Sequence, residues 1–239
     1  MGVAAAPESE VSNETLANVI WSALTGPYQE PLATGGPLAR RYPREFAPFG
    51  ATADSSREGF QALRALFAPG EPLALFTARH VDPGKAFEVI ARKDAVQMIQ
   101  TRRATPQHTE FSLLQPSDAQ EMRALVDLTK PGPFAERTHE LGRFLGLREH
   151  GRLVAMAGER LRLEGFTEVS AVCTHPEYRG RGLGRASVRA VASGIWERGE
   201  IPILHALADN SAAIALYREL DFVVQQELQL TLLRASPVE

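Results

Sequence analysis

The sequence predicts an α/β fold of mixed α+β type, in which helices flank a mixed β-sheet. Apolar runs of strand length recur along the chain, segments with helical spacing of apolar residues lie between them, and one glycine-rich turn joins a strand to a helix. With 239 residues, 44% hydrophobic and 23% charged, the chain can bury a core without disulfides. We expect two units, an N-terminal accessory α+β region at residues 1–107 and a second domain at residues 108–239.

The first helix is expected after Asn13, which is a suitable N-cap. Its apolar face consists of Leu16, Val19, Ile20 and Leu24. Gly26 and Pro27 end this pattern, and the dense Pro and Gly of residues 27–52 predict irregular chain or short strands.

A second helix is expected after Ser55, which forms a capping-box pattern with Glu58. Its apolar face consists of Phe60, Leu63, Leu66 and Phe67. Residues 73–77 and 86–91 are two apolar runs, and the Pro-Gly turn signal at residues 80–84 predicts that they form a hairpin.

The second unit is expected to begin near His108, with a strand that holds Phe111, Leu113 and Leu114. Ser117 and Gln120 form another capping-box pattern. The helix that follows has an apolar face of Met122, Leu125 and Val126, and it ends at the Pro-Gly-Pro of residues 131–133.

An antiparallel meander is expected next, with strands at residues 144–148, 153–161 and 166–174. The glycine-rich turn at residues 179–184 then opens a helix whose apolar face is Val188, Val191 and Ile195. A strand at residues 201–207, a helix at 211–220 and a last apolar segment at 222–233 complete the predicted order.

The bulk composition argues against several classes of partner. A net charge of −3, from 26 basic and 29 acidic side chains, gives no cationic field for nucleic acid. No apolar run approaches the roughly 20 residues of a membrane span. The one cysteine, Cys173, lies in an apolar run and is expected to pack rather than to form a disulfide. We therefore expect a cytoplasmic protein without a nucleic-acid or membrane partner.

The strongest motif is the strand, glycine-rich turn and helix start at residues 172–185. Free amides at a helix N-terminus attract anions, and the nearby Arg179, Arg181 and Arg185 add positive charge, so a pyrophosphate suits the turn. The alternative is a turn that uses its glycines for geometry alone. A Rossmann motif is disfavoured because Ser187 stands three positions after Gly184, and a Walker Lys-Ser/Thr pair is missing.

Arg179-x-x-Gly182-x-Gly184 after an apolar strand resembles the coenzyme A signature of the GNAT superfamily of N-acetyltransferases. A second signature of that superfamily is similar to Asn210, Ala213, Leu216, Tyr217 and the Leu-Asp-Phe of residues 220–222, where Asp221 replaces the usual glycine. The flanking segments are closest to the FR47-like branch. The resemblance spans roughly residues 108–233 and implies a GNAT-like acyl-CoA N-acyltransferase fold, with residues 1–107 as an α+β extension or a degenerate second domain.

The resemblance also implies the cofactor contacts. The main chain of Val172, Cys173 and Thr174 would pair with the pantetheine arm, Asn210 would hydrogen-bond near the thioester, and Tyr217 would face the sulfur. The pyrophosphate would be held by the amides of Arg179, Gly180, Arg181, Gly182, Leu183, Gly184 and Arg185. The alternative for Asn210 is a helix N-cap, and for Tyr217 it is core packing.

Tyr217 is the expected general acid, because a phenol with a pKa of roughly 10 stays protonated while the departing thiol has a pKa of roughly 8.5. Glu168 is the preferred base, because strand alternation would place it on one face with Ser170, Val172 and Thr174. Glu159 is a second candidate, acting through water. Either glutamate is alternatively an exposed carboxylate at a strand edge.

The remaining chemical candidates are weaker. His175 precedes a proline and is expected to shape the turn, and Cys173 lacks the His-Asp partners of a nucleophile. No metal site is expected.

The sequence therefore predicts an enzyme that transfers acetyl from acetyl-CoA to a small-molecule or peptide amine by direct attack in a ternary complex. A homodimer is compatible with it. The alternatives are a non-catalytic acyl-CoA-binding or interaction module and a nucleotide-binding protein. The second half has 15 basic and 18 acidic side chains, which gives weak support for a cationic acceptor.

Overall fold

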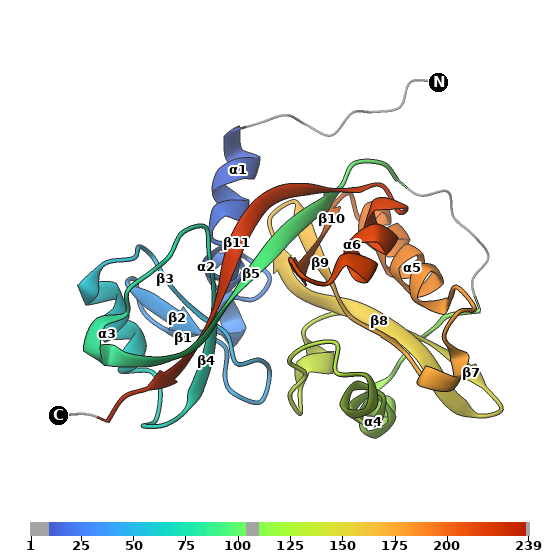
Figure 1. Cartoon of the computed structure of the whole chain (residues 1–239), viewed down its shortest axis with the longest axis horizontal. Helices are drawn as coiled ribbons and strands as arrows, with labels where there is room; N and C mark the ends of the chain where they lie inside the picture. The colour runs from blue at the N-terminus through green and yellow to red at the C-terminus, as the bar shows by residue number, and fades with distance from the viewer. Residues whose placement is uncertain (1–9, 104–109, 238–239) are drawn as a thin grey trace.

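The computed structural model describes residues 10–103 and 110–237 and is built around one eight-stranded sheet (Figure 1). The strand order is β4-β11-β5-β10-β9-β8-β7-β6, with a separate three-stranded sheet of β1, β2 and β3. The long strands β5 (Phe87–Gln100) and β11 (Phe222–Ala235) run through the middle of the molecule and connect its two lobes. The predicted α/β class with a mixed sheet is confirmed.

The N-terminal helix is broken in two, α1 (Glu10–Ala17) and α2 (Val19–Thr25). Asn13 therefore lies inside α1 and is not the N-cap that the sequence suggests, while Gly26 ends α2 as expected. A 3-10 turn, η1 (Glu30–Leu32), and three short strands follow: β1 (Thr34–Gly35), β2 (Ala39–Arg41) and β3 (Gly50–Thr52).

Helix α3 (Arg57–Arg64) is capped one residue later than predicted. The Ser56 hydroxyl, rather than that of Ser55, accepts from the Gly59 amide at 3.0 Å. Phe60 and Leu63 of this helix are buried against β4 (Pro72–Thr77) and the ends of β5 and β11.

The predicted hairpin between β4 and β5 is wrong. Both strands pair antiparallel with β11, which lies between them, and the turn η2 (Gly84–Ala86) only connects them along the chain. Strand β11 pairs with the backbone N–H and C=O groups of both neighbours. In a two-stranded hairpin, each strand would have one edge whose backbone groups are unpaired.

The other half of the chain follows the predicted order. After β6 (Ser112–Leu113), the turn η3 (Pro116–Asp118) leads into α4 (Ala119–Thr129). The capping box consists of Gln115 and Asp118 rather than Ser117 and Gln120. The turn η4 (Thr138–Glu140) precedes the meander of β7 (Phe144–Glu149), β8 (Arg152–Leu163) and β9 (Phe166–Thr174), which is antiparallel as expected.

Helices α5 and α6 complete this half. The turn η5 (Pro176–Tyr178) leads into α5 (Leu183–Glu197), whose predicted face of Val188, Val191 and Ile195 is buried against the sheet. Strand β10 (Ile201–Leu207) and α6 (Ser211–Arg218) precede β11. No helix among the described residues is long and apolar enough to span a bilayer.

The expected boundary between residues 107 and 108, and the expected start near His108, lie outside the described residues. The eight-stranded sheet contains strands from both sides of that position, because β5 pairs with β10 and β11. The two predicted units therefore share one sheet.

Two irregularities shape the sheet near the start of α5. A β-bulge in β9 includes Ala171, which has a φ of 50°, and shifts the register between Met156/Cys173 and Gly158/Ser170. In addition, β9 and β10 pair in parallel only as far as Glu168 and Ile203, although both strands continue beyond this point. The sheet is therefore splayed between β9 and β10.

Candidate functional site

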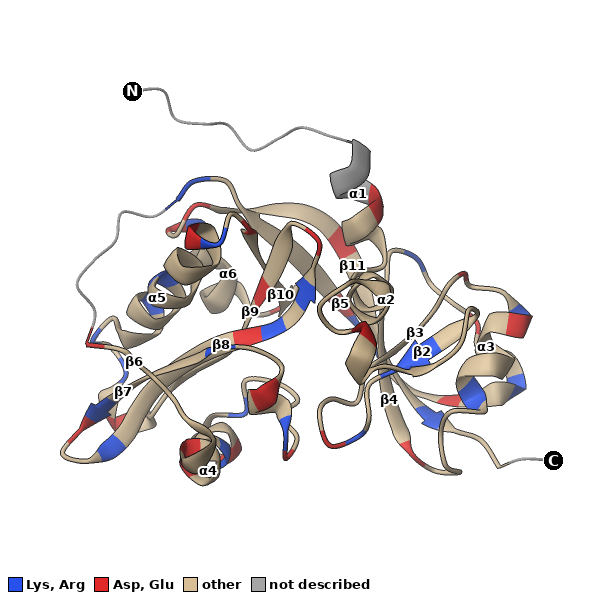
Figure 2. Cartoon of the chain, turned by 180° about the vertical axis from the view of Figure 1, so that it is seen from behind, with Lys and Arg blue, Asp and Glu red and all other residues tan. Residues whose placement is uncertain are grey.

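A cavity of about 650 Å³ lies at the splay between β9 and β10. Its lining brings together several residues singled out in the sequence: Glu168, Val172, Thr174, Arg179, Asn210 and Tyr217. The opposite end is lined by residues of β4, β5 and β11, and thus includes the N-terminal region. Figure 2 shows basic and acidic residues interspersed over the whole fold. The distribution of charge therefore does not identify the site, whereas the cavity does.

The glycine-rich turn next to this cavity has the backbone geometry of an anion site. Gly180 and Gly182 have φ values of 77° and 75°, and Gly182 is the N-cap of α5. In the described part of the chain, the amides from Gly180 to Arg185 donate no hydrogen bond, and the first helical bond runs from Ala186 N to Gly182 O at 3.0 Å. These amides are available to an anion.

The three arginines of the motif have different surroundings. Arg181 makes two bonds to the Glu149 carboxylate, at 2.6 and 3.0 Å, and Arg185 contacts Glu219. Arg179 makes no ion pair among the described residues and lines the cavity. It is therefore the arginine of the motif best placed to meet a bound anion.

A Gly182→Ala substitution tests this turn. A φ of 75° costs a residue with a Cβ roughly 1–2 kcal/mol, and no atom lies within 4 Å of the new Cβ, so only backbone conformation changes. We expect urea unfolding to show that stability falls by about 1 kcal/mol. Calorimetric titration with acetyl-CoA, the cofactor expected from the sequence, should show binding weakened roughly tenfold. Gly194→Ala, inside α5, is the control and should leave binding unchanged. Wild-type affinity in Gly182→Ala would contradict the role of these amides.

Asn210 and Tyr217 lie on α6 at the cavity. The Asn210 side-chain oxygen caps the helix by accepting from the Ala213 amide at 3.2 Å, which confirms the N-cap reading and leaves its NH₂ group available for a ligand. Burial, followed by the charges of Cys173 and Glu168, raises the pKa of Tyr217 to about 12. No hydrogen bond between described residues engages the Tyr217 hydroxyl. Tyr217 thus presents a protonated, uncommitted phenol to the cavity.

Glu168 lies at the centre of a buried polar network. Arg160 binds both of its oxygens, at 2.7 and 2.8 Å, and His205 Nδ1 lies 2.7 Å from Oε1. Burial alone would raise the pKa of Glu168, but the charge of Arg160 and the bonds from His205 and Arg160 outweigh it and lower the pKa to about 2. A carboxylate held in this way is a weak proton acceptor.

The network continues behind His205. The Gln226 amide nitrogen donates to Gln97 Oε1 at 2.9 Å, so the Gln97 nitrogen points to His205 Nε2 at 3.0 Å. Nε2 is then the acceptor, which leaves the proton on Nδ1, facing Glu168. Phe76 stacks on the imidazole with ring centroids 4.8 Å apart.

Arg160, His205 and Gln97 were not singled out in the sequence. Arg160 is adjacent to the candidate Glu159, but a buried arginine in a strand carries no local signal. His205 and Gln97 stand opposite each other in the register of β10 and β5, a pairing that sequence alone does not reveal.

The predicted common face of Glu168, Val172 and Thr174 is wrong, because the bulge at Ala171 reverses the alternation of β9. Val172 packs on the α5 and α6 side, whereas Glu168 joins Arg160 and His205 on the other side. All of these residues still line the cavity, since it passes through the splay.

Glu159 does not line the cavity. It is opposite Val169 in the register, on the α5 side, and its carboxylate lies 3.0 Å from Arg198. Glu159 is therefore separated from the cavity that brings the other candidates together.

Cys173 and His175 have the structural roles expected of them. Cys173 is buried against α4, and burial raises the pKa of its thiol to about 11, which makes it a poor nucleophile. His175 is the N-cap of η5, where its Nδ1 accepts from the Glu177 amide at 3.3 Å.

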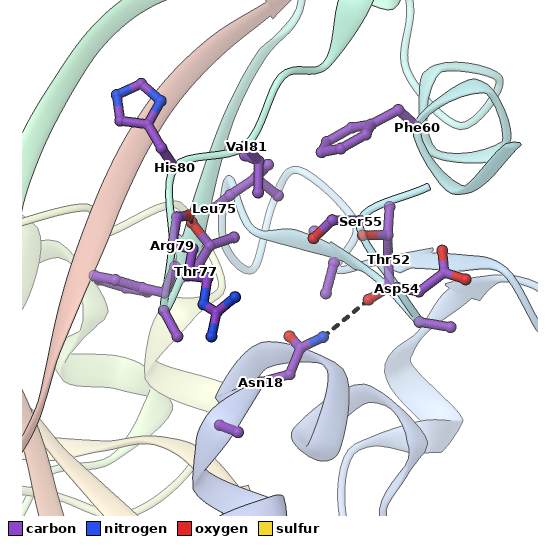
Figure 3. Close-up of a pocket in the computed structure, with 16 residues that line it drawn as sticks. Asn18, Thr52, Asp54, Ser55, Phe60, Leu75, Thr77, Arg79, His80 and Val81 are labelled. Atoms are coloured by element: carbon purple, nitrogen blue, oxygen red, sulfur yellow. Dashed lines mark hydrogen bonds between the residues drawn. The ribbon is translucent and has the colours of Figure 1, made fainter. Parts of the chain in front are cut away.

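A second hollow, of about 380 Å³, lies between the junction of α1 and α2 at Ala17 and Asn18, β3, α3 and β4 (Figure 3). Its Asn18 side chain already donates to the Thr52 carbonyl at 2.9 Å, and Asp54, Arg79 and His80 lie at its rim without forming a cluster. None of the described residues that line this second hollow has a buried polar side-chain atom without a hydrogen-bond partner, so the cavity at the β9/β10 splay remains the candidate active site.

Several known proteins are similar to this chain. The sequence model of FR47-like proteins matches residues 144–230, from β7 to β11. A crystal structure of a GNAT-family chain from Novosphingobium aromaticivorans is similar over 93% of this chain and 99% of its own, with 38% identity and a TM-score of 0.87.

Two curated proteins are also similar. The N-alpha-acetyltransferase RimI of Mycobacterium tuberculosis is 38% identical over 99 residues, which are 38% of this chain and 61% of the relative. The mycothiol acetyltransferase of Saccharopolyspora erythraea is 28% identical over 178 residues, which are 72% of this chain and 55% of the relative. The matched part thus spans less than two thirds of either relative.

Proposed function

The chain belongs to the GNAT family of acetyltransferases, and on that premise we propose that it transfers acetyl from acetyl-CoA to an amine by direct attack. The observation that carries the proposal is the splay between β9 and β10 beside the free amides of the turn before α5. An extended pantetheine arm fits the edge of β9, and the diphosphate fits the turn.

The reaction follows from the groups at the cavity. The lone pair of the amine nitrogen forms a bond to the thioester carbonyl carbon, and the carbon–sulfur bond breaks with its electron pair on sulfur. Tyr217 then protonates the thiolate, because its raised pKa keeps the phenol protonated at neutral pH. In this proposal the side-chain NH₂ of Asn210 hydrogen-bonds the arm near the thioester, while its oxygen caps α6.

The amine proton needs a different acceptor from the one that the sequence suggested. Because Arg160 and His205 occupy both oxygens of Glu168, we assign Glu168 to charge balance in the cavity wall, and the proton leaves to water at the cavity mouth. The exposed Lys93 and Lys130 in the lining show that the cavity reaches solvent.

Thiol release from acetyl-CoA, measured with a broad panel of amines, tests the proposal. CoA release that depends on an amine, with mass spectrometry of the acetamide, is the expected result. Binding of acetyl-CoA without release on any amine would favour the non-catalytic acyl-CoA-binding module instead. A larger melting shift with ATP or NAD than with CoA would favour a nucleotide-binding protein.

A further inference from the structure

The end of the cavity away from the glycine-rich turn is an apolar wall made by the N-terminal region and β11. Leu230 is opposite Phe76 of β4 on one side and opposite Lys93 of β5 on the other, so these three side chains lie in one row on the same face of the sheet. The next row places Ala74 beside Leu232. An acceptor that reaches this wall meets a largely apolar surface.

The charges of the lining have the opposite sign from the chain as a whole. Glu168 is the one carboxylate among the described residues that line the cavity, and it is neutralised by Arg160. Lys93, Lys130 and Arg179 line the same cavity and make no ion pair among the described residues. The weak expectation of a cationic acceptor from the composition is therefore not supported by the lining.

We propose that the acceptor is a small apolar amine that carries a carboxylate, with its apolar body on the wall of Phe76 and Leu230 and its carboxylate at Lys93. This inference rests on the proposed acetyl transfer. Lys93 ends the row of apolar side chains and is exposed at the cavity mouth, so an aminocarboxylate can cover Leu230 and still reach the ammonium group. A polyamine would place its extra positive charges next to Lys93 and Lys130, which is unfavourable.

Lys130, the lining cation to which no anion is assigned, also favours the reactive form of the acceptor. A positive surrounding disfavours the ammonium form of a bound amine, and a neutral amine is the nucleophile. Removing a proton from an amine with a pKa of roughly 10.4 at neutral pH costs about 4–5 kcal/mol at roughly 1.36 kcal/mol per pH unit. Lys130 reduces this cost without a dedicated base.

Acetyl-CoA turnover with matched acceptor pairs tests the inference. Leucine is compared with leucinamide, 6-aminohexanoate with hexylamine, and spermidine is included as a polycation. We expect at least one carboxylate-bearing member to exceed its uncharged or carboxylate-free partner in kcat/KM by roughly tenfold, as expected for a charge-assisted hydrogen bond. Spermidine should be the poorest acceptor.

The variant Lys93→Gln should abolish that preference by lowering kcat/KM for the carboxylate-bearing member to about the value of its carboxylate-free partner. Lys85→Gln, which removes an exposed lysine outside the cavity lining, is the matched control and should keep it. Equal rates for both members of every pair, or preferred acetylation of spermidine, would overturn the inference while leaving acetyl transfer intact. Failure of every amine, including those of the broad panel, would instead overturn acetyl transfer and this inference with it.

Discussion

Tyr217→Phe lowers kcat by roughly 10² to 10⁴ and leaves the Kd for acetyl-CoA nearly unchanged: this is the expected result if Tyr217 protonates the leaving thiolate. The hydroxyl makes no hydrogen bond among the described residues, so its removal leaves no buried partner unsatisfied. The ring still packs near Phe222, with centroids 6.2 Å apart in the native structure. Single-turnover kinetics and calorimetric titration measure the two quantities.

Tyr178→Phe is the matched control, because Tyr178 lies in η5 beside the same turn but does not line the cavity. It should retain wild-type kcat. A Tyr217→Phe enzyme that loses acetyl-CoA binding in proportion to its rate would show that the ring holds the cofactor and donates no proton. In the wild type, a pKa near 12 for Tyr217 predicts that ionisation of this phenol limits the rate only above about pH 11.

Arg160→Met is expected to destabilise the fold by about 3–5 kcal/mol, because it leaves the buried carboxylate of Glu168 without its cation. The double variant Arg160→Met/Glu168→Leu removes both charges and should recover most of this loss. Urea unfolding at neutral pH measures the free energy of unfolding of each variant. If the double variant is no more stable than Arg160→Met, the loss comes from packing and not from an unpaired charge.

Arg137→Met provides the control for the ion pair. Arg137 binds Glu140 at 2.7 Å, but both side chains are more than a third exposed and screened by solvent, so the expected loss of stability is much smaller than that of Arg160→Met. Acid adds a second measurement. The folded pKa of Glu168 is lowered to about 2, so its contribution is present above its unfolded pKa of roughly 4.3 and is lost as the pH falls toward 2. Wild type should therefore lose more stability than the double variant over that range.

The parts of the fold that could be predicted from sequence are those with local signals. Strands β9 and β10 have the bounds that their apolar runs indicate, and α5 buries the face that its spacing indicates. The turn at Gly180 and Gly182 was recognisable because positive φ values favour glycine. Local chemistry thus indicated the glycine-rich turn that we propose binds the diphosphate of acetyl-CoA.

The remaining features depend on residues that are distant in the sequence or on exceptions to local rules. The insertion of β11 between β4 and β5 replaced the expected hairpin, since turn signals do not report which strand becomes a neighbour. The bulge at Ala171 has a φ of 50° at a residue other than glycine, so the sequence contains no glycine there that would predict the bulge. The hydrogen bonds that hold Glu168 as a carboxylate include one from His205, which is 37 residues away in the sequence. Because of these bonds, the role proposed for Glu168 changed from base to charge balance.

The position of β11 also has a consequence for protein synthesis. Gln97 and Gln226, which bond across β5 and β11, are 129 residues apart in the sequence. On the ribosome, β4 and β5 emerge long before the strand that must separate them, so their edges wait unpaired while the rest of the chain is made. During that interval β4 and β5 are candidates for chaperone binding. The apolar wall of Phe76 and Leu230 forms only when β11 has joined the sheet.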